Sequence, residues 1–485
     1  MRNSSPAPIT FGNDSNFGVT SICQMLFDQL GESGIVSKGL VGDSRSWRRN
    51  YTISFANAVP LEFHVSSQTL IDGLLDTFLN LACASDGTPL RDFVASAWEK
   101  KDLVNLSEFA GGGTAQRIEL PDSDWNSDAQ RQLDWSLAET ELLTAARRLD
   151  GLKSTTGIPA LIAFAGGAEL SAVSHWLRWG GTALLLARTT GVELNDLTKL
   201  ASASGGSLWV VSDAETGETG VDLVARADLA AAAIARFVAT HPKQNFVFGH
   251  FGYAPGIAHL RLEAVAQALT ELVLKKLAGK RLQFSWLATP TDSLAVPVEF
   301  ANQRRESWAN RSMLERTLEV PWRMLGYLKT PSLARFVSAS GEELAVLDSA
   351  ARLQGPSYSL AKRIQRWRAS SLRKQGILTS YQITPPARTD SVLRHKILRS
   401  TYRGMSRFGV HPFDSYSASI WPAALYALDS LRQTPETSKP SQSATDWYFA
   451  RAIHGGLWRT RYEASTIWVP ATALGLVLPG RKEWR

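Results

Sequence analysis

Tyr358 and Lys362 are the two residues whose types and spacing are best suited to chemistry. They are four positions apart, so a helix would place both side chains on one face. A Lys ammonium beside a phenol favours the phenolate and therefore lowers the pKa of the Tyr. A phenol tuned in this way can donate or accept a proton near neutral pH. The spacing thus predicts a general acid/base at Tyr358, supported by Lys362.

Three elements must position this pair. A helix begins at about residue 355, a turn follows near Gly376, and a short apolar strand covers 377–383. The strand leads into a Pro-Pro turn at Pro385 that ends in Thr389. An ordinary basic amphipathic helix with an exposed Tyr is the alternative interpretation of the same residues.

Upstream of this segment, residues 157–290 alternate short apolar runs with helical ones. Continuous apolar runs are typical of strands buried on both faces of a sheet. Strands separated by helices indicate an α/β fold with a doubly wound, mostly parallel, Rossmann-like sheet. The five strands predicted here are 159–164, 182–188, 207–211, 245–248 and 282–287.

A helix carrying Tyr-x-x-x-Lys, then a strand, then a Pro turn with Thr resembles the second half of the short-chain dehydrogenase/reductase family. The resemblance implies an NAD(P)-dependent oxidoreductase in which Tyr358 is the general acid/base. Lys362 would bind the nicotinamide ribose and tune the Tyr. Pro385 and Thr389 would lie beside the nicotinamide.

The same resemblance implies a catalytic Ser just past the fifth strand, where its hydroxyl would hold the substrate carbonyl. Thr289, Thr291 and Ser293 follow that strand, and Ser293 is the favoured candidate. Residues 293–353 then form a charged insertion, predicted to be largely helical. The insertion makes the separation between this Ser and Tyr358 much longer than in the family.

Glycines at two strand ends are the candidate cofactor-binding residues. Glycine lets the backbone approach a pyrophosphate, and a following helix N-terminus favours the negative charge. Gly166 and Gly167 follow the first strand, where the family has Gly-x-x-x-Gly-x-Gly, and two adjacent glycines also occur in turns without any ligand. Gly249 and Gly252 follow the fourth strand.

The identity of the cofactor rests on the end of the second strand. An acid there would accept the adenosine ribose hydroxyls, whereas a base can hold a 2′-phosphate. Arg188 occupies this position and is followed by two threonines. The sequence therefore favours NADP over NAD, with a solvated strand-end Arg as the alternative.

The domain organisation expected from these patterns has three parts. Residues 1–150 are predicted to be an N-terminal mixed α/β lobe. Residues 151–410 are predicted to be the Rossmann-like reductase domain with the insertion near 293–353. Residues 411–485 are predicted to be a Trp-rich extension that packs on the main domain.

Charge and composition restrict the partners. The formal net charge is +7, and residues 361–410 hold twelve Lys or Arg against one acid, Asp390. Such a segment is either a solvated basic face or a site for an anion, which could be a cofactor phosphate, an acidic carrier, a membrane or a nucleic acid. No nucleic-acid motif accompanies the charge, so the sequence disfavours nucleic acid.

Cysteine content and hydrophobic runs point to a cytoplasmic protein. Cys23 and Cys83 provide neither a disulfide framework nor a metal cluster, so no metal site is expected. No run of 18 or more apolar residues predicts a transmembrane helix, and the first residues lack the apolar core of a secretory signal.

The leading hypothesis from the sequence is an NAD(P)H-dependent reductase or dehydrogenase. It would act on a small-molecule or carrier-bound carbonyl or alcohol. The alternative is a reductase-like fold without turnover that acts as a binding or assembly protein, because the glycine turn departs from the family pattern. A homo-oligomer is left open.

Overall fold

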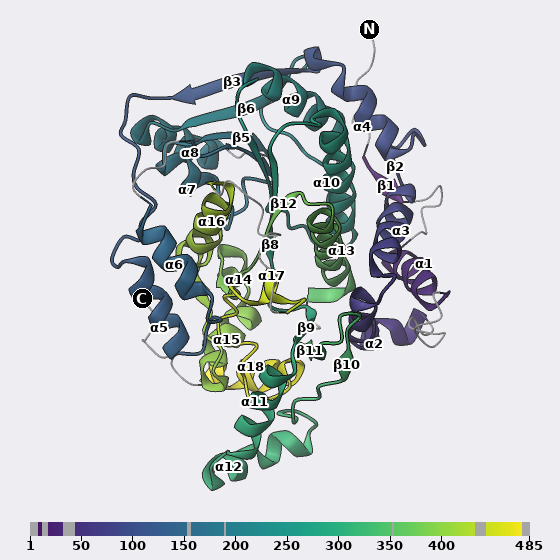
Figure 1. Cartoon of the computed structure of the whole chain (residues 1–485), viewed down its shortest axis with the longest axis vertical. Coiled ribbons are helices and arrows are strands. Elements are labelled where there is room, and N and C mark those ends of the chain that lie inside the picture. The colour runs from purple at the N-terminus through teal and green to yellow at the C-terminus, as the bar shows by residue number, and fades with distance from the viewer. Residues whose placement is uncertain are drawn as a thin grey trace.

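A seven-stranded sheet forms the centre of the molecule in the computed structural model of the chain (Figure 1). The structure describes residues 8–11, 18–32, 44–152, 157–188, 191–351, 354–431 and 443–477. The strand order across the sheet is β12-β8-β7-β4-β5-β6-β3. The strands are β3 (Val104–Ala110), β4 (Ala160–Phe164), β5 (Thr182–Leu186), β6 (Ser207–Asp213), β7 (Phe246–His250), β8 (Leu282–Ala288) and β12 (Leu378–Ile383).

Six strands are mutually parallel, and only β3, at the edge next to β6, is antiparallel. Numbered by their order along the chain, the six parallel strands have the spatial order 3-2-1-4-5-6. This is the order of dinucleotide-binding sheets, in which the winding reverses between the first and fourth strands. The switch point therefore lies between β4 and β7. The predicted α/β class with a mostly parallel sheet is confirmed.

Side chains of the central strands alternate between two apolar cores. Ile162 and Phe164 of β4 point into one core, whereas Leu161 and Ala163 point into the other. This alternation is the period of two that a pleated strand imposes. The first core holds α9 (Ala227–Thr240), α10 (Ile257–Lys276) and α13 (Gly355–Lys374), and the second holds α7 (Val173–Arg178), α8 (Gly191–Ser204) and α16 (Ser415–Leu431).

Residues 1–150, which we expected to form a lobe, contribute to the sheet and to both of its faces. Strand β3 completes the sheet beside β6. Helices α5 (Trp125–Asp134) and α6 (Leu142–Asp150) share the second core with α16. The first core receives β1 (Thr10–Phe11), α1 (Val19–Glu32), α2 (Ser44–Asn57), the 3-10 helix η1 (Val59–Phe63), α3 (Ser67–Asn80), β2 (Ala82–Cys83) and α4 (Leu90–Trp98).

The insertion after β8 is helical only in its first half. Helices α11 (Val298–Ala309) and α12 (Met313–Met324) follow β9 (Ser293–Pro297). Strands β10 (Arg335–Val337) and β11 (Glu343–Asp348) then pair with β9 in an antiparallel sheet. The prediction of a largely helical insertion is therefore wrong for its second half, where the chain forms short strands.

The C-terminal residues contain several short elements around the long helix α16. These are β13 (Ala387–Arg388), α14 (Asp390–Arg394), α15 (Lys396–Met405), β14 (Phe413–Asp414), α17 (Asp446–Phe449) and α18 (Trp468–Val477). Residues 418–430 of α16 are all buried, and the helix contacts β8 and β12. Within the described ranges, no helix has the length and apolarity needed to cross a bilayer.

Candidate functional site

The first turns of α13 lie over the carboxyl ends of the strands. Because α13 leads into β12, which is parallel to β8, the helix runs opposite to the strands. Lys362 Nζ donates to the carbonyl oxygen of Leu287, at the end of β8, at 2.9 Å. The Tyr358 ring centroid lies 5.5 Å from that of His259 on α10. The predicted pair Tyr358 and Lys362 is therefore together at this edge of the sheet.

The predicted lowering of the Tyr358 pKa is wrong. Burial raises the pKa of this phenol, and a hydrogen bond with Thr289 offsets only part of the rise. Lys362 Nζ lies 5.8 Å from the centroid of the Tyr358 ring, and its hydrogen bonds go to Leu287 and to Gln365 Oε1. The ammonium is thus engaged elsewhere, and desolvation determines the state of the phenol.

A group of buried ionisable and amide side chains surrounds Lys362, and we name it the switch-point cluster. Its members are His250, His259, Glu263, Lys362 and Gln365. Burial raises the pKa of Glu263, whose two carboxyl oxygens accept hydrogen bonds from Gln267 and Gln365 at 2.6 Å each. Burial lowers the pKa of Lys362 to about 8, against the attraction of the Glu263 and Asp292 carboxylates.

The cavity beside this cluster is very small. It is lined by Phe164 and Ala165 at the end of β4 and by His250, His259 and Gln365. Its volume is about 10 Å³. A cavity needs roughly 10–15 Å³ to hold one water molecule, so this one offers no room for a nucleotide.

The predicted cofactor glycines approach the protein's own side chains. A Cβ at Gly166 would lie 2.7 Å from the Cβ of Ala163, and one at Gly249 would lie 2.6 Å from the Phe251 ring. A Cβ at Gly252 would lie 2.7 Å from Leu262 Cδ2, and one at Gly167 would meet Ala187 at 3.4 Å. These glycines permit internal packing, so their backbones do not form an open cradle for a pyrophosphate.

The helix after β4 also differs in position and length from the helix that a dinucleotide site needs. Helix α7 begins only at Val173 and is six residues long. Ser171 Oγ donates to the carbonyl oxygen of Gly166 at 2.6 Å within the intervening loop. A dinucleotide site needs a helix N-terminus directly after the glycine turn. The residues present therefore do not fit the pyrophosphate of NADP or NAD.

Arg188 lies at the end of β5, as predicted, with its side chain 80% exposed. Its guanidinium is 3.6 Å from the carboxylate of Asp222. The two threonines that follow it lie outside the described residues. Binding of a 2′-phosphate by Arg188 stays a prediction, and the nearby acid opposes it.

The hydroxyl of Ser293 makes a hydrogen bond inside the protein. The residue is fully buried at the start of β9, and its Oγ donates to Asp348 Oδ1 at 3.0 Å. Asp348 is half-buried, and the desolvation of its carboxyl raises its pKa to about 6. The hydroxyl of Ser293 therefore connects β9 to β11 and does not face a substrate space.

The predicted nicotinamide residues lie under or beside the C-terminal segment. Pro385 is buried next to Gly455. Thr389 is half-buried before α14, where its hydroxyl and that of Ser391 are 3.0 Å apart. The backbone N–H of Ile453 donates to the carbonyl oxygen of Ile383 at the end of β12. The chain itself thus covers this part of the carboxyl edge.

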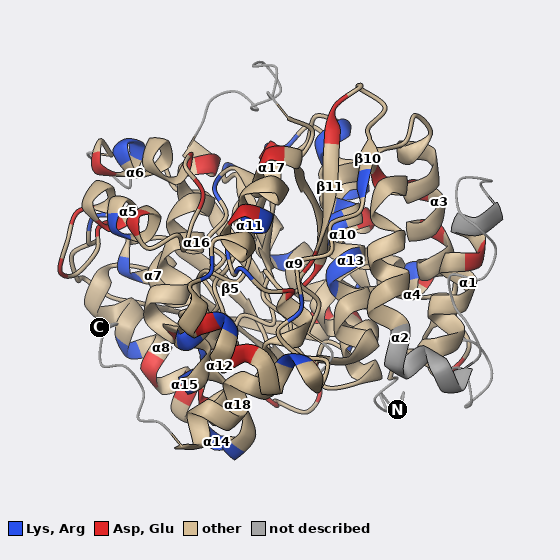
Figure 2. Cartoon of the chain, turned by 90° about the horizontal axis from the view of Figure 1, so that it is seen from below, with Lys and Arg blue, Asp and Glu red and all other residues tan. Residues whose placement is uncertain are grey.

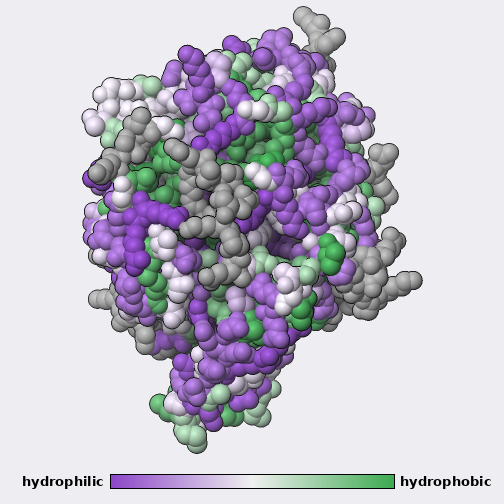
Figure 3. Space-filling view, in the orientation of Figure 1, coloured by the Kyte–Doolittle hydropathy of each residue, from purple (hydrophilic) through white to green (hydrophobic). Residues whose placement is uncertain are grey.

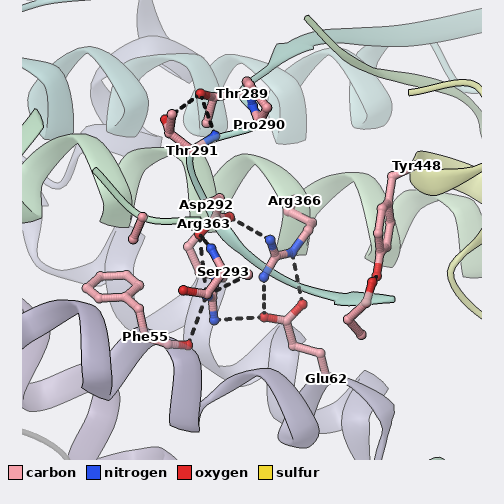
Figure 4. A network of polar contacts seen from close by, with 12 residues as sticks. Phe55, Glu62, Thr289, Pro290, Thr291, Asp292, Ser293, Arg363, Arg366 and Tyr448 are labelled. Carbon is pink, nitrogen blue, oxygen red and sulfur yellow. Dashed lines mark hydrogen bonds and ion pairs between the residues drawn. The ribbon is translucent and has the colours of Figure 1, made fainter. Parts of the chain in front are cut away.

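Two cations of the basic segment, Arg363 and Arg366, belong to a buried ion network (Figure 4). Arg366 makes two hydrogen bonds to the Glu62 carboxylate, at 2.9 and 3.0 Å, and one to Asp292 at 2.5 Å. Arg363 Nη1 lies 3.0 Å from Glu62. Burial raises the pKa of Glu62, but the two arginines more than offset this and leave the pKa lowered. These cations stabilise the contact of η1 with α13 and are not free to bind an anion.

A larger pocket opens on the other side of the loop that follows β4. Its volume is about 200 Å³, and it lies between α5 and the start of α16. Glu169 of the loop accepts hydrogen bonds from the Asp390 N–H, at 2.9 Å, and from the Ser415 hydroxyl, so the pocket adjoins the carboxyl end of β4. Sheets of this kind bind ligands outside the carboxyl ends of their strands.

The walls of this pocket combine apolar side chains with charges of both signs. Leu120, Phe413, Ile420 and Trp421 supply apolar surface. Asp128 accepts from Trp421 Nε1 at 2.8 Å and pairs with Arg131, and Asp414 caps α16 by accepting from the Ser417 N–H and hydroxyl. The two remaining charges are Asp122 and Arg388, for which the described residues provide no ion pair.

Sequence reasoning missed this pocket. Arg388 stands in the Pro-Pro turn that was singled out, but Asp122 lies far away in the sequence and carries no local signal. Among the described ranges, no group of three or more His, Cys, Asp or Glu is arranged to hold a metal ion.

No protein-family profile matches the chain, and no curated protein sequence matches it. What the chain shows is an α/β fold with a mostly parallel seven-stranded sheet. Its function must therefore be inferred from the geometry of the site.

Proposed function

We propose that the chain binds a small zwitterion with an apolar side group in the pocket between α5 and α16, without nicotinamide-dependent turnover. The observation that carries the proposal is the presence of Asp122 and Arg388, two opposite charges without an ion pair among the described residues, on the wall of a pocket that also offers apolar surface. A hydrophobic amino acid has the matching chemistry.

Each part of such a ligand has a counterpart in the pocket. The carboxylate would accept two parallel hydrogen bonds from the planar guanidinium of Arg388. The ammonium would pair with Asp122. The apolar group would pack on Ile420 and Trp421. Pockets for drug-sized ligands are about 300–1,000 Å³, so a volume of about 200 Å³ fits a smaller molecule.

Calorimetric titration with L-leucine tests the proposal. Arg388→Gln and Asp122→Asn each remove one charge and keep a polar side chain. Hydrogen bonds to charged groups are worth about 1.5–3 kcal/mol, so each variant should bind about 10- to 100-fold more weakly. Arg399→Gln on α15 is the matched control and should bind like the wild type, because Arg399 is exposed and does not line the pocket.

Blocked ligands separate the two charges. N-acetyl-leucine lacks the ammonium and leucinamide lacks the carboxylate, so both should bind more weakly than leucine. Equal binding of all three compounds, or unchanged binding by both pocket variants, would contradict the proposal.

The second candidate is an oxidoreductase acting on a carbonyl or alcohol with Tyr358 as the proton donor. One observation favours it: Tyr358 and Lys362 lie at the carboxyl edge beside the β4/β7 switch point. A raised pKa keeps the phenol protonated at neutral pH, which suits a proton donor. The candidate ranks second because the glycine turn and the short α7 do not fit the cofactor.

A further inference from the structure

Helix α12 protrudes from one end of the molecule (Figure 1), and hydrophobic residues lie on the surface of that end (Figure 3). Six large apolar side chains of this segment are between 49% and 83% exposed. At 100° per residue they fall within an arc of about 160° on the helix. An exposed stripe of this kind marks a binding surface in a soluble protein. These side chains are Met313, Leu314, Leu318, Val320, Met324 and Leu325.

The opposite face of α12 is firmly held. Ser312 and Glu315 form a capping box at its start. Glu319 is buried, accepts from the Tyr462 hydroxyl at 2.6 Å and pairs with Arg311 at 3.1 Å. Trp322 packs against the apolar cluster that contains Trp468 of α18. The contacts of Glu319 and Trp322 therefore hold α12 in place, and its apolar stripe faces the solvent.

Exposed cations gather at the same end of the molecule. Helix α15 packs closely on α18, because a Cβ at Gly404 would lie 1.9 Å from the carbonyl oxygen of Ala471. Trp322 of α12 packs against the apolar cluster of these two helices, so α12, α15 and α18 are neighbours (Figure 2). Residues 298–329 and 390–410 expose nine Lys or Arg but only three acids. The cations are Arg305, Arg316, Arg323, Lys329, Arg394, Lys396, Arg399, Arg403 and Arg407.

We propose that this end of the molecule docks on an anionic lipid bilayer, with α12 lying in the interface. An amphipathic helix can bury its Met and Leu side chains at the boundary between headgroups and acyl chains, while Lys and Arg attract anionic headgroups. Arg316 and Arg323 border the stripe on the helix and lie where headgroups would be.

The exposed cations and the apolar stripe together favour an anionic bilayer over other partners. A nucleic acid would pair with the cations but would leave the Met and Leu stripe in water. A second copy of the chain would cover the stripe but would bring like charges together, which is unfavourable. An anionic bilayer satisfies both features.

Sedimentation with lipid vesicles tests the inference in the full-length protein. The wild type should sediment with vesicles of phosphatidylcholine plus phosphatidylglycerol and should remain in solution with phosphatidylcholine alone. The double variant Leu314→Glu/Leu318→Glu should lose sedimentation. Arg316→Gln/Arg323→Gln should bind about 25-fold more weakly, since each cation near an anionic surface is worth about fivefold.

Val192→Glu on α8 is the matched control, because Val192 is 72% exposed and α8 lies at the other end of the molecule (Figure 1). It should sediment like the wild type, and circular dichroism melts should show that all variants are folded. Wild-type protein that stays in solution with both vesicle types overturns the inference. A concentration-dependent dimer that is lost in Leu314→Glu/Leu318→Glu, without vesicle binding, would assign the stripe to a second copy and overturn it as well.

Discussion

At the residue scale, three histidines are buried as neutral rings. Burial, together with the repulsion of nearby cations, lowers the pKa of His175, His250 and His259 to about 3. His175 shares a hydrogen bond of 2.9 Å with the hydroxyl of Ser419 on α16, so it joins α7 to the buried helix. The rings can gain protons only when the core opens.

The stability of the protein should therefore fall as the pH is lowered below about 6.5. The unfolded histidines have a pKa near 6.5, whereas the folded ones have a pKa of about 3, so the unfolded state binds more protons between these values. Urea denaturation at pH 7 and pH 5.5 measures the loss. His175→Gln should reduce the slope, because it removes one of the three groups. An unfolding free energy that is the same at both pH values would contradict this account.

The sequence identified part of the site through local spacing. Tyr358 and Lys362 are one helical turn apart, and Gly252 follows a strand that was predicted, so all three could be placed at one edge. The pKa of Tyr358 and the surroundings of Gly166 depend on side chains from other elements. Local spacing carries no information about those contacts.

At the element scale, the parallel strands were predictable because they are buried on both faces. Strand β4 is buried over its whole length and is read as one apolar run. Strand β11 was missed because its short apolar run lies inside a charged stretch that was predicted to be largely helical. Its pairing with β9 depends on a contact between segments that are distant in sequence.

The packing of α15 on α18 rests on glycine. A Cβ at Gly404 would lie 1.9 Å from the Ala471 carbonyl oxygen and 2.9 Å from the Gly475 nitrogen. Gly404→Ala should therefore force the helices apart, at a cost of about 1–3 kcal/mol of unfolding free energy. Chemical denaturation measures this change.

Gly112→Ala provides the control for this substitution. A Cβ at Gly112 would meet nothing within 4 Å, so the variant should differ from the wild type by less than about 0.5 kcal/mol. If Gly404→Ala were as stable as Gly112→Ala, the two helices would not be in the close contact described.

At the scale of the whole molecule, the basic segment 361–410 separates into two parts. Arg363 and Arg366 are buried with acids from η1 and from the residue before β9, whereas the cations of α14 and α15 are exposed. From the sequence, the segment could be either a solvated basic face or an anion site, because Glu62 and Asp292 lie far from it in the chain. Only the fold brings these charges together.

The same scale explains why a Rossmann-like strand order need not hold a dinucleotide. The switch point between β4 and β7 is filled by the switch-point cluster, and residues 450–458 cover the ends of β8 and β12. The open space at the carboxyl edge lies instead on the side of α5 and α16. A fold fixes where a site can be, and the side chains decide what it holds.

Titration of NADPH into the pure protein, followed by nicotinamide fluorescence, tests the central claim most directly. Because the glycine turn is packed internally and the cavity at the switch point is about 10 Å³, we expect no saturable enhancement and no rise in the thermal midpoint. Saturable enhancement that is weakened by Lys362→Ala, but not by Arg394→Ala on the exposed α14, would contradict the account and restore the reductase hypothesis.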